Sequence, residues 1–143
     1  MHIQEREADK MVIREKIKTQ HNKVTDLTGM VKQAVQNSGV QDGLCVISVP
    51  HTTAALVITS FWDPLGWEDL MDELNRLIPS RIDFKHQESP TDASGHLKSA
   101  LTGTSMVQII EGGRLLLGSS QGIYFLEFDG PRTREVIIKI MQG

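Results

Sequence analysis

The order of apolar and polar positions along the chain first predicts β-strands. In "MVIREKIKT", residues 11–19, Ile13 and Ile17 alternate with charged neighbours, which indicates a half-exposed strand at an edge or outer face of a sheet. The segments "GLCVISVP" and "AALVITS" are apolar and rich in β-branched residues, which predicts two interior strands. Because these segments meet at "PHTT", His51 is expected at the end of a strand.

Two other segments space their apolar residues as an amphipathic helix does. The first can use Thr25 or Asp26 as its N-cap and is expected to stop at Gly39. The second begins at Asp63, which is followed by a proline, and stops at Pro79. Its apolar stripe, which we assign to the core, consists of Trp67, Leu70, Met71, Leu74, Leu77 and Ile78.

The second half of the chain predicts a long loop, a short helix and four strands. Residues 80–93 lack periodicity and collect turn formers, so they are expected to form a loop that is either functional or disordered. "SGHLKSALTG" offers two or three helical turns that end at Gly103, and the strands follow in "SMVQII", "RLLLG", "IYFLEF" and "EVIIKIM". Their connectors are too short for crossover helices, which favours antiparallel pairing. We therefore predict an α+β class with about seven strands and three helices.

Composition narrows the class of protein. With 143 residues, of which 39% are hydrophobic, the chain is expected to form a single domain over 1–143 with a polar N-terminal extension over 1–10. A net charge of -3 without a Lys/Arg block argues against a nucleic-acid partner. The extension is too charged for a signal peptide, and no apolar run approaches the roughly 20 residues that cross a bilayer. The only cysteine, Cys45, lies in an apolar run, so a cytoplasmic protein that does not enter the membrane is expected.

Three histidines are the first candidates for chemistry. His51 lies at a strand end, while His86 and His96 lie in or beside the long loop, so the three imidazoles can converge on a divalent metal such as zinc or magnesium. Asp92 can then orient an imidazole or act as a general base. The spacing of His86 and His96 matches no compact metal motif, so exposed or capping histidines are the alternative.

Small and basic residues suggest an anion site. The loop "GSSQG" contains Ser119, Ser120, Gln121 and Gly122, whose amides and hydroxyls can bind a phosphate, although a plain hairpin turn is the alternative. In "DGPRTR" the two arginines are either exposed or placed to bind a phosphate or carboxylate. Lys98 is either a solvated helix residue or, if its helix faces a cleft, a contact of the ligand.

The ordered series "HTTAAL", "DP", "WEDL", "GHLKSALTGTS", "GRLLLG" and "QGIYFLEFDGPR" resembles the YjbQ family. The resemblance covers nearly the whole chain from residue 11, and members of this family are often labelled secondary thiamine-phosphate synthase enzymes. It implies a YjbQ-like α+β fold, a mixed and largely antiparallel sheet sandwich with about three helices, that assembles as a homotrimer. It also implies a shared site, because the characteristic histidines of the family match His51, His86 and His96, and its acidic positions match Asp63, Asp69 and Asp92.

Two departures from the family pattern concern the substrate. The family commonly has Thr-Trp where this chain has Ser119 and Ser120, which removes an aromatic surface for stacking. An Asn-containing stretch is also usual where this chain has "SFWDP", so a polar contact before Asp63 is in doubt.

The sequence therefore leads to a main hypothesis, an alternative, and a third interpretation as a structural protein whose histidines only cap strands. The main hypothesis is an enzyme that acts on a phosphorylated small molecule, with thiamine-phosphate synthesis as the named reaction. In it, His51, His86 and His96 hold a metal or donate to phosphate, Asp92 moves a proton, and Lys98 acts together with the loop of residues 119–122 on the anion. The alternative is a trimeric protein that binds a metal or small anion without turnover.

Overall fold

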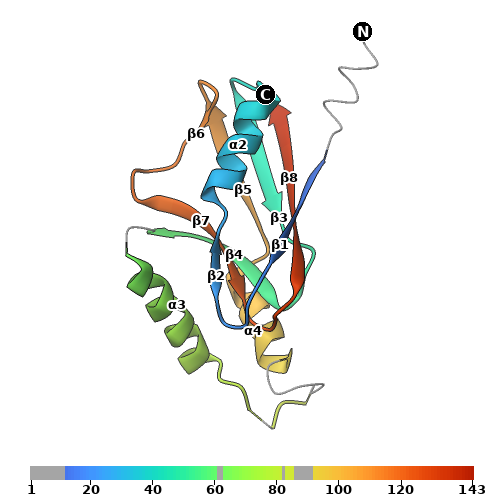
Figure 1. The fold of residues 1–143 in the computed structure, drawn as a ribbon, viewed down its shortest axis with the longest axis vertical. Coiled ribbons are helices and arrows are strands. Elements are labelled where there is room, and N and C mark those ends of the chain that lie inside the picture. The colour runs from blue at the N-terminus through green and yellow to red at the C-terminus, as the bar shows by residue number, and fades with distance from the viewer. Residues whose placement is uncertain (1–11, 61–62, 82, 86–91) are drawn as a thin grey trace.

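The computed structural model describes residues 12–60, 63–81, 83–85 and 92–143. In these residues the chain forms three helices and eight strands, and the strands build two antiparallel sheets (Figure 1). The predicted α+β class is confirmed. The polar N-terminal extension and His86 lie outside the described residues.

The larger sheet has five strands, in the order β1 (Ile13–Lys18), β8 (Thr133–Gln142), β3 (Gly43–Ser48), β5 (Ser105–Glu111) and β6 (Arg114–Leu115). All neighbouring strands in it run antiparallel. The edge position of β1 and the interior position of β3 are as predicted.

The smaller sheet has three strands, in the order β2 (Val24–Asp26), β7 (Gln121–Glu127) and β4 (Ala54–Ser60), which also pair antiparallel. The prediction that β4 is an interior strand is wrong, because β4 forms an edge of this sheet. Strand β2 was not predicted, since three residues are too few to show a period. The short connector between β7 and β8 does not make them neighbours, because they belong to different sheets.

Helix α2 (Thr28–Ser38) ends as predicted, at Gly39, whose φ of 72° lies in the left-handed region that favours glycine. Its N-cap residue is Leu27 rather than either of the polar residues expected there. The Oδ1 atom of Asp26 nevertheless accepts a hydrogen bond from the Thr28 N–H, at 2.9 Å. The side chain therefore still satisfies one of the unpaired N–H groups of the first turn.

Helix α3 (Pro64–Leu77) and helix α4 (Asp92–Thr102) lie together at one end of the molecule (Figure 1). The carboxylate of Asp63 caps α3 by accepting from the Leu65 N–H, as the sequence predicts. Helix α4 begins at Asp92, inside the stretch that was expected to be a loop. As a result, Asp92 lies one helical turn before His96.

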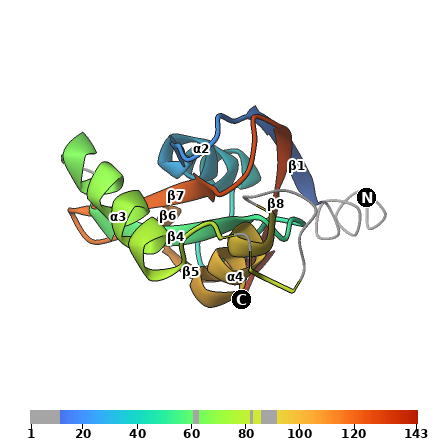
Figure 2. The same cartoon turned by 90° about the horizontal axis from the view of Figure 1, so that it is seen from below.

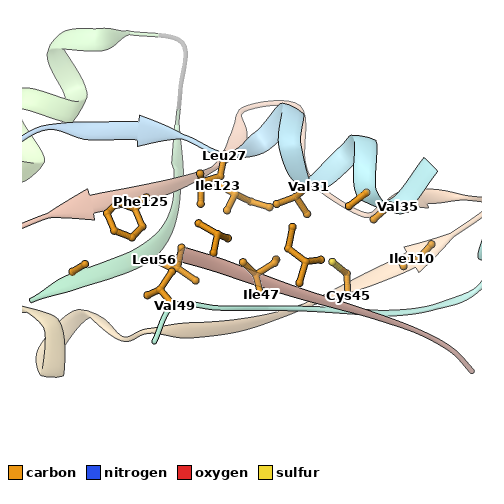
Figure 3. Close-up of a cluster of buried hydrophobic side chains, with 14 residues drawn as sticks. Leu27, Val31, Val35, Cys45, Ile47, Val49, Leu56, Ile110, Ile123 and Phe125 are labelled. Atoms are coloured by element: carbon orange, nitrogen blue, oxygen red, sulfur yellow. The ribbon is translucent and has the colours of Figure 1, made fainter. Parts of the chain in front are cut away.

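Two apolar clusters lie on opposite faces of the three-stranded sheet. The larger one joins α2 to both sheets (Figure 3) and contains Leu27, Val31, Ala34, Val35, Cys45, Ile47, Val49, Ala54, Leu56, Ile110, Ile123, Phe125, Val136 and Ile138. The smaller one joins the sheet to α3 and contains Ala55, Met71, Leu74, Tyr124, Leu126 and Phe128. Because successive residues of β7 enter different clusters, both faces of the strand are buried, which accounts for its continuous apolar run.

Seen from below, α2 and α4 lie on opposite sides of β4 and β7 (Figure 2). The apolar stripe of α3 is buried only in part, because Met71 and Leu74 are buried whereas Leu77 is 59% exposed. Within the described residues, no helix is both long and apolar enough to span a membrane.

Candidate functional site

Two separate pockets flank helix α4. The histidine pocket has a volume of about 380 Å³ and is lined by His51, Thr52, His96, Ser99, Ala100, Gly103 and Thr104. The lysine cavity has a volume of about 270 Å³ and is lined by His21, Asn22, Asn75, Pro79, Ser80, Lys98 and Phe128. Lys98 follows His96 by two positions, which is a rotation of about 200° around a helix axis. The two side chains therefore leave α4 in nearly opposite directions.

In the histidine pocket, both ring nitrogens of His96 have a partner. Nδ1 lies 3.0 Å from the carbonyl oxygen of Thr52, which can only accept, so Nδ1 donates. Nε2 lies 3.0 Å from Oδ1 of Asp92, one turn earlier on α4. This arrangement of carboxylate, imidazole and carbonyl holds the ring in one orientation and places an acid and a base side by side.

His51 lines the same pocket from the segment between β3 and β4. Its Nε2 atom accepts a hydrogen bond of 2.9 Å from the backbone N–H of Glu135, so a neutral ring carries its proton on Nδ1. Burial, and then the positive charge of Arg134, lower the pKa of His51 below its ordinary value of 6.5. His51 is therefore a neutral imidazole near pH 7 that can donate from Nδ1.

These contacts decide which residues suit a metal ion. His96 suits one, because its Nδ1–H is held by a carbonyl oxygen while Nε2 faces a carboxylate that can serve as a second ligand. Nε2 of His51 is not suited to a metal ion, because its lone pair already accepts a hydrogen bond from the backbone N–H of Glu135. In the part of the chain that the structure describes, no group of three or more His, Cys, Asp or Glu side chains is placed to hold a metal. His86, the third predicted ligand, lies outside that part.

On the other side of α4, Lys98 is only 3% exposed, so the interpretation of Lys98 as a solvated helix residue is wrong. Its ammonium group donates to Oδ1 of Asn75 on α3 and lies 5.7 Å from the centre of the Phe128 ring. Burial lowers the pKa of Lys98 below the ordinary value of 10.5. The helix does face a cavity, as the second interpretation of Lys98 required.

The loop predicted to bind phosphate is remote from both pockets. Ser119, Ser120, Gln121 and Gly122 lie at the start of β7, where Gln121 pairs with the last residue of β4. His51 precedes the other end of β4, so the two places are separated by the length of the strand, roughly 20 Å for seven residues. The side chain of Gln121 accepts from the Gly118 N–H, which closes the turn.

A buried ion pair that the sequence did not predict lies beside His51. Arg134 donates from Nε to Oε1 of Glu127 at 2.7 Å, and its Nη2 donates to the hydroxyl of Thr53 at 2.9 Å and also to Oε2 of Glu127. Burial alone would raise the pKa of Glu127, but hydrogen bonds from Arg134, the Thr19 hydroxyl and the Asp129 N–H lower it overall. Of the two arginines in "DGPRTR", Arg134 thus binds a carboxylate of its own chain.

Comparison with known proteins identifies the family. The family described as "UPF0047 protein YjbQ-like" matches residues 14–143. The chain belongs to this family. It is 44% identical to the UPF0047 protein of Methanocaldococcus jannaschii over 92% of this chain and 95% of that protein, and 40% identical to the UPF0047 protein YugU of Bacillus subtilis over 86% and 92%.

Solved structures agree with this assignment. An uncharacterized conserved protein of the YjbQ/UPF0047 family from Clostridium acetobutylicum superposes with a TM-score of 0.85 and 44% identity, over 90% of this chain and 99% of that one. A hypothetical protein from Aeropyrum pernix superposes with a TM-score of 0.86 and 34% identity, over 93% and 99%. The names of these relatives state no reaction, so thiamine-phosphate synthesis stays a prediction for this UPF0047 chain.

Proposed function

We propose that this protein is an enzyme that acts on a phosphorylated small molecule in the histidine pocket. The observation that carries the proposal is that one pocket is lined both by a neutral donor, His51, and by His96, whose Nε2 is paired with Asp92. Residues that act as general acids and bases are held in this way, in a fixed tautomer and within reach of one cavity.

Each side chain has a role in this proposal. The Nδ1–H of His51 donates to an oxygen of the phosphoryl group, which stabilises negative charge that develops there. With the proton between them, His96 and Asp92 act as an acid that protonates the leaving oxygen. Without it, they act as a base that takes a proton from the attacking group. Thr52 keeps the His96 ring in place through its carbonyl oxygen.

A divalent metal would replace the proton between His96 and Asp92, so it is an alternative to their acid–base role rather than an addition to it. Nε2 of His96 and Oδ1 of Asp92 would hold it, and His86 remains the proposed third ligand. Imidazole ligation favours zinc over magnesium, and the ion would supply a Lewis acid to the phosphoryl oxygens.

The proposed homotrimer would account for two further features. The outer face of the five-stranded sheet exposes Leu44, Val107, Ile109 and Met141, which are neighbours across β3, β5 and β8. Apolar side chains gathered in this way favour contact with another copy of the chain. The loop of residues 119–122, which is remote from the histidines in its own chain, would then bind the phosphoryl group only if a neighbouring subunit brought it to the pocket.

The test is turnover by the purified protein. Release of phosphate and pyrophosphate is measured over a panel of phosphate monoesters and pyrophosphates, and the condensation of the pyrimidine pyrophosphate with the thiazole phosphate is assayed separately. His96→Asn keeps a donor toward Thr52, and His51→Gln keeps an acceptor toward Glu135, so both variants should fold. Each is expected to lose about 10²–10⁴-fold in rate, as when an acid–base group is removed.

The control is Arg76→Gln, which alters an exposed ion pair on α3 and should keep the wild-type rate. Full activity in both histidine variants would refute the proposed site. Tight binding of a phosphorylated compound without product formation would refute the enzyme and favour the binding protein.

A further inference from the structure

The lysine cavity contains a buried positive charge with only neutral partners. Asn75 accepts from Lys98 through Oδ1 and donates through Nδ2 to Oδ1 of Asn22, at 2.7 Å. Asn22 has a φ of 60°, in the left-handed region that asparagine tolerates, and its backbone N–H donates to the backbone carbonyl oxygen of Glu127. Asn75 on α3 thus holds the ammonium group, and Asn22 in turn holds Asn75. Among the described residues, Lys98 forms no ion pair.

A buried ammonium group without a counter-charge is costly, because it has left water and gained only dipoles. The cavity offers room for that counter-charge. Its volume of about 270 Å³ is far above the roughly 10–15 Å³ needed for one water molecule. Of the three N–H donors of an ammonium group, one points to Asn75 and two remain.

The rest of the lining also suits a negative ligand. None of the described residues that line the cavity is acidic. His21 also lines the cavity, but its Nδ1 already donates to the carbonyl oxygen of Asp129, so the further donors come from Ser80 and Asn22. The polar groups of this wall therefore combine one positive charge with neutral hydrogen-bond donors, which is the complement of an oxyanion.

We propose that the lysine cavity is a second binding site, which takes the phosphoryl or carboxylate group of a small anion with Lys98 as its charged contact. The site is independent of the reaction proposed for the histidine pocket, because α4 separates the two. Lys98 acts as a point charge, a common way to bind phosphate. The relay through Asn75 and Asn22 positions its ammonium group before the anion arrives.

The test is isothermal titration with inorganic phosphate and, in a parallel arm, with acetate. Both arms use the His51→Gln/His96→Asn double variant, so that binding in the histidine pocket does not contribute. Asn75→Asp places a carboxylate next to Lys98 at nearly constant volume and should weaken binding of the anion by at least about tenfold, the loss expected for one charge-assisted contact. Lys98→Met should weaken it at least as much.

The matched control is Asn37→Asp, the same substitution on the exposed face of α2, which should bind as the parent does. A thermal melt of each variant checks folding.

Tighter binding of phosphate than of acetate assigns the site to phosphoryl groups, and the reverse assigns it to carboxylates. The proposal is overturned if neither anion binds at millimolar concentration, or if a folded Asn75→Asp variant binds as tightly as its parent. Loss of turnover in the histidine variants with anion binding intact would separate the two proposed sites.

Discussion

Arg134 and Lys98 are both almost fully buried, at 5% and 3% exposure, yet their surroundings differ. Arg134 meets the carboxylate of Glu127 through two of its nitrogens, and Thr19 and Thr53 satisfy further polar atoms. Lys98 meets an amide oxygen and an aromatic ring beside a cavity. The first arrangement is complete within the chain, which is typical of a structural ion pair. The second leaves room for a ligand, which is typical of a binding site.

The largest expected effect comes from breaking the complete pair. Glu127→Gln leaves the guanidinium of Arg134 buried without its counter-charge, which should lower the free energy of unfolding by about 3–5 kcal/mol. Urea denaturation followed by circular dichroism measures this change. A loss below about 1 kcal/mol, as for an exposed pair, would show that the pair is not structural.

Removing the charge of Lys98 itself should instead stabilise the folded chain. Lys98→Met removes a buried charge and keeps most of the side-chain volume, so we expect the free energy of unfolding to rise by about 0.5–2 kcal/mol, as when a strained functional site is relieved. The same urea titration, without added phosphate, tests this. Marked destabilisation would mean that the chain itself supplies a counter-charge for Lys98, and the comparison with Arg134 would fail.

The pH dependence of stability should separate the two charges as well. The pKa of Glu127 is lower in the folded chain than its ordinary 4.5, so its contribution is present above pH 4.5 and is lost as the pH falls through the folded value. The pKa of Lys98 is also lowered, so between the folded value and 10.5 the unfolded chain binds more protons and stability rises with pH. Burial raises the pKa of Cys45 to about 11 and also raises that of Tyr124, so these two groups lower stability over the same alkaline range. The contribution of Lys98 is therefore the difference between the wild type and Lys98→Met in thermal melts, and this difference should become more favourable to the wild type as the pH rises toward 10.5.

The smallest effect belongs to an exposed pair. Glu73 and Arg76 are separated by 2.7 Å on α3, but both side chains are more than half exposed. Glu73→Gln should change the free energy of unfolding by about 0–1 kcal/mol, because water and salt screen the pair. A change as large as that in Glu127→Gln would mean that burial does not set the value of ion pairs in this protein.

The sequence predicted the features of the fold that depend on local patterns. The cap at Asp63, the stop at Gly39 and the half-exposed strand β1 all follow from nearby residues, and all three are present. The assignment of strands to two sheets is not encoded locally, since β7 and β8 are separated by only a short turn. Sheet membership depends on pairing partners that are distant in sequence, because β7 pairs with β2 and β4 whereas β8 pairs with β1 and β3.

The residues of the two pockets were predicted less completely than the strands and helices, because their contacts depend on how distant elements pack. His51 and His96 were expected to share a site because both fall at the ends of elements, and the structure places them in one pocket. The burial of Lys98 depends on the position of α3 against α4, which no spacing in "GHLK" reveals. Glu127 did offer a signal, because a charged residue inside the apolar run "IYFLEF" must find a partner when both faces of its strand are buried.

If Lys98 is a buried cation whose cavity binds an anion, the titration of its own side chain should respond to phosphate. The Cε and Nζ resonances of Lys98, assigned with the Lys98→Met variant in isotope-labelled protein, can be followed over pH with and without inorganic phosphate. Without phosphate the pKa of Lys98 should lie below 10.5, and phosphate should raise it, because a bound anion stabilises the charged form. A titration at the ordinary lysine value that phosphate does not alter would show that Lys98 is neither desolvated nor part of an anion site.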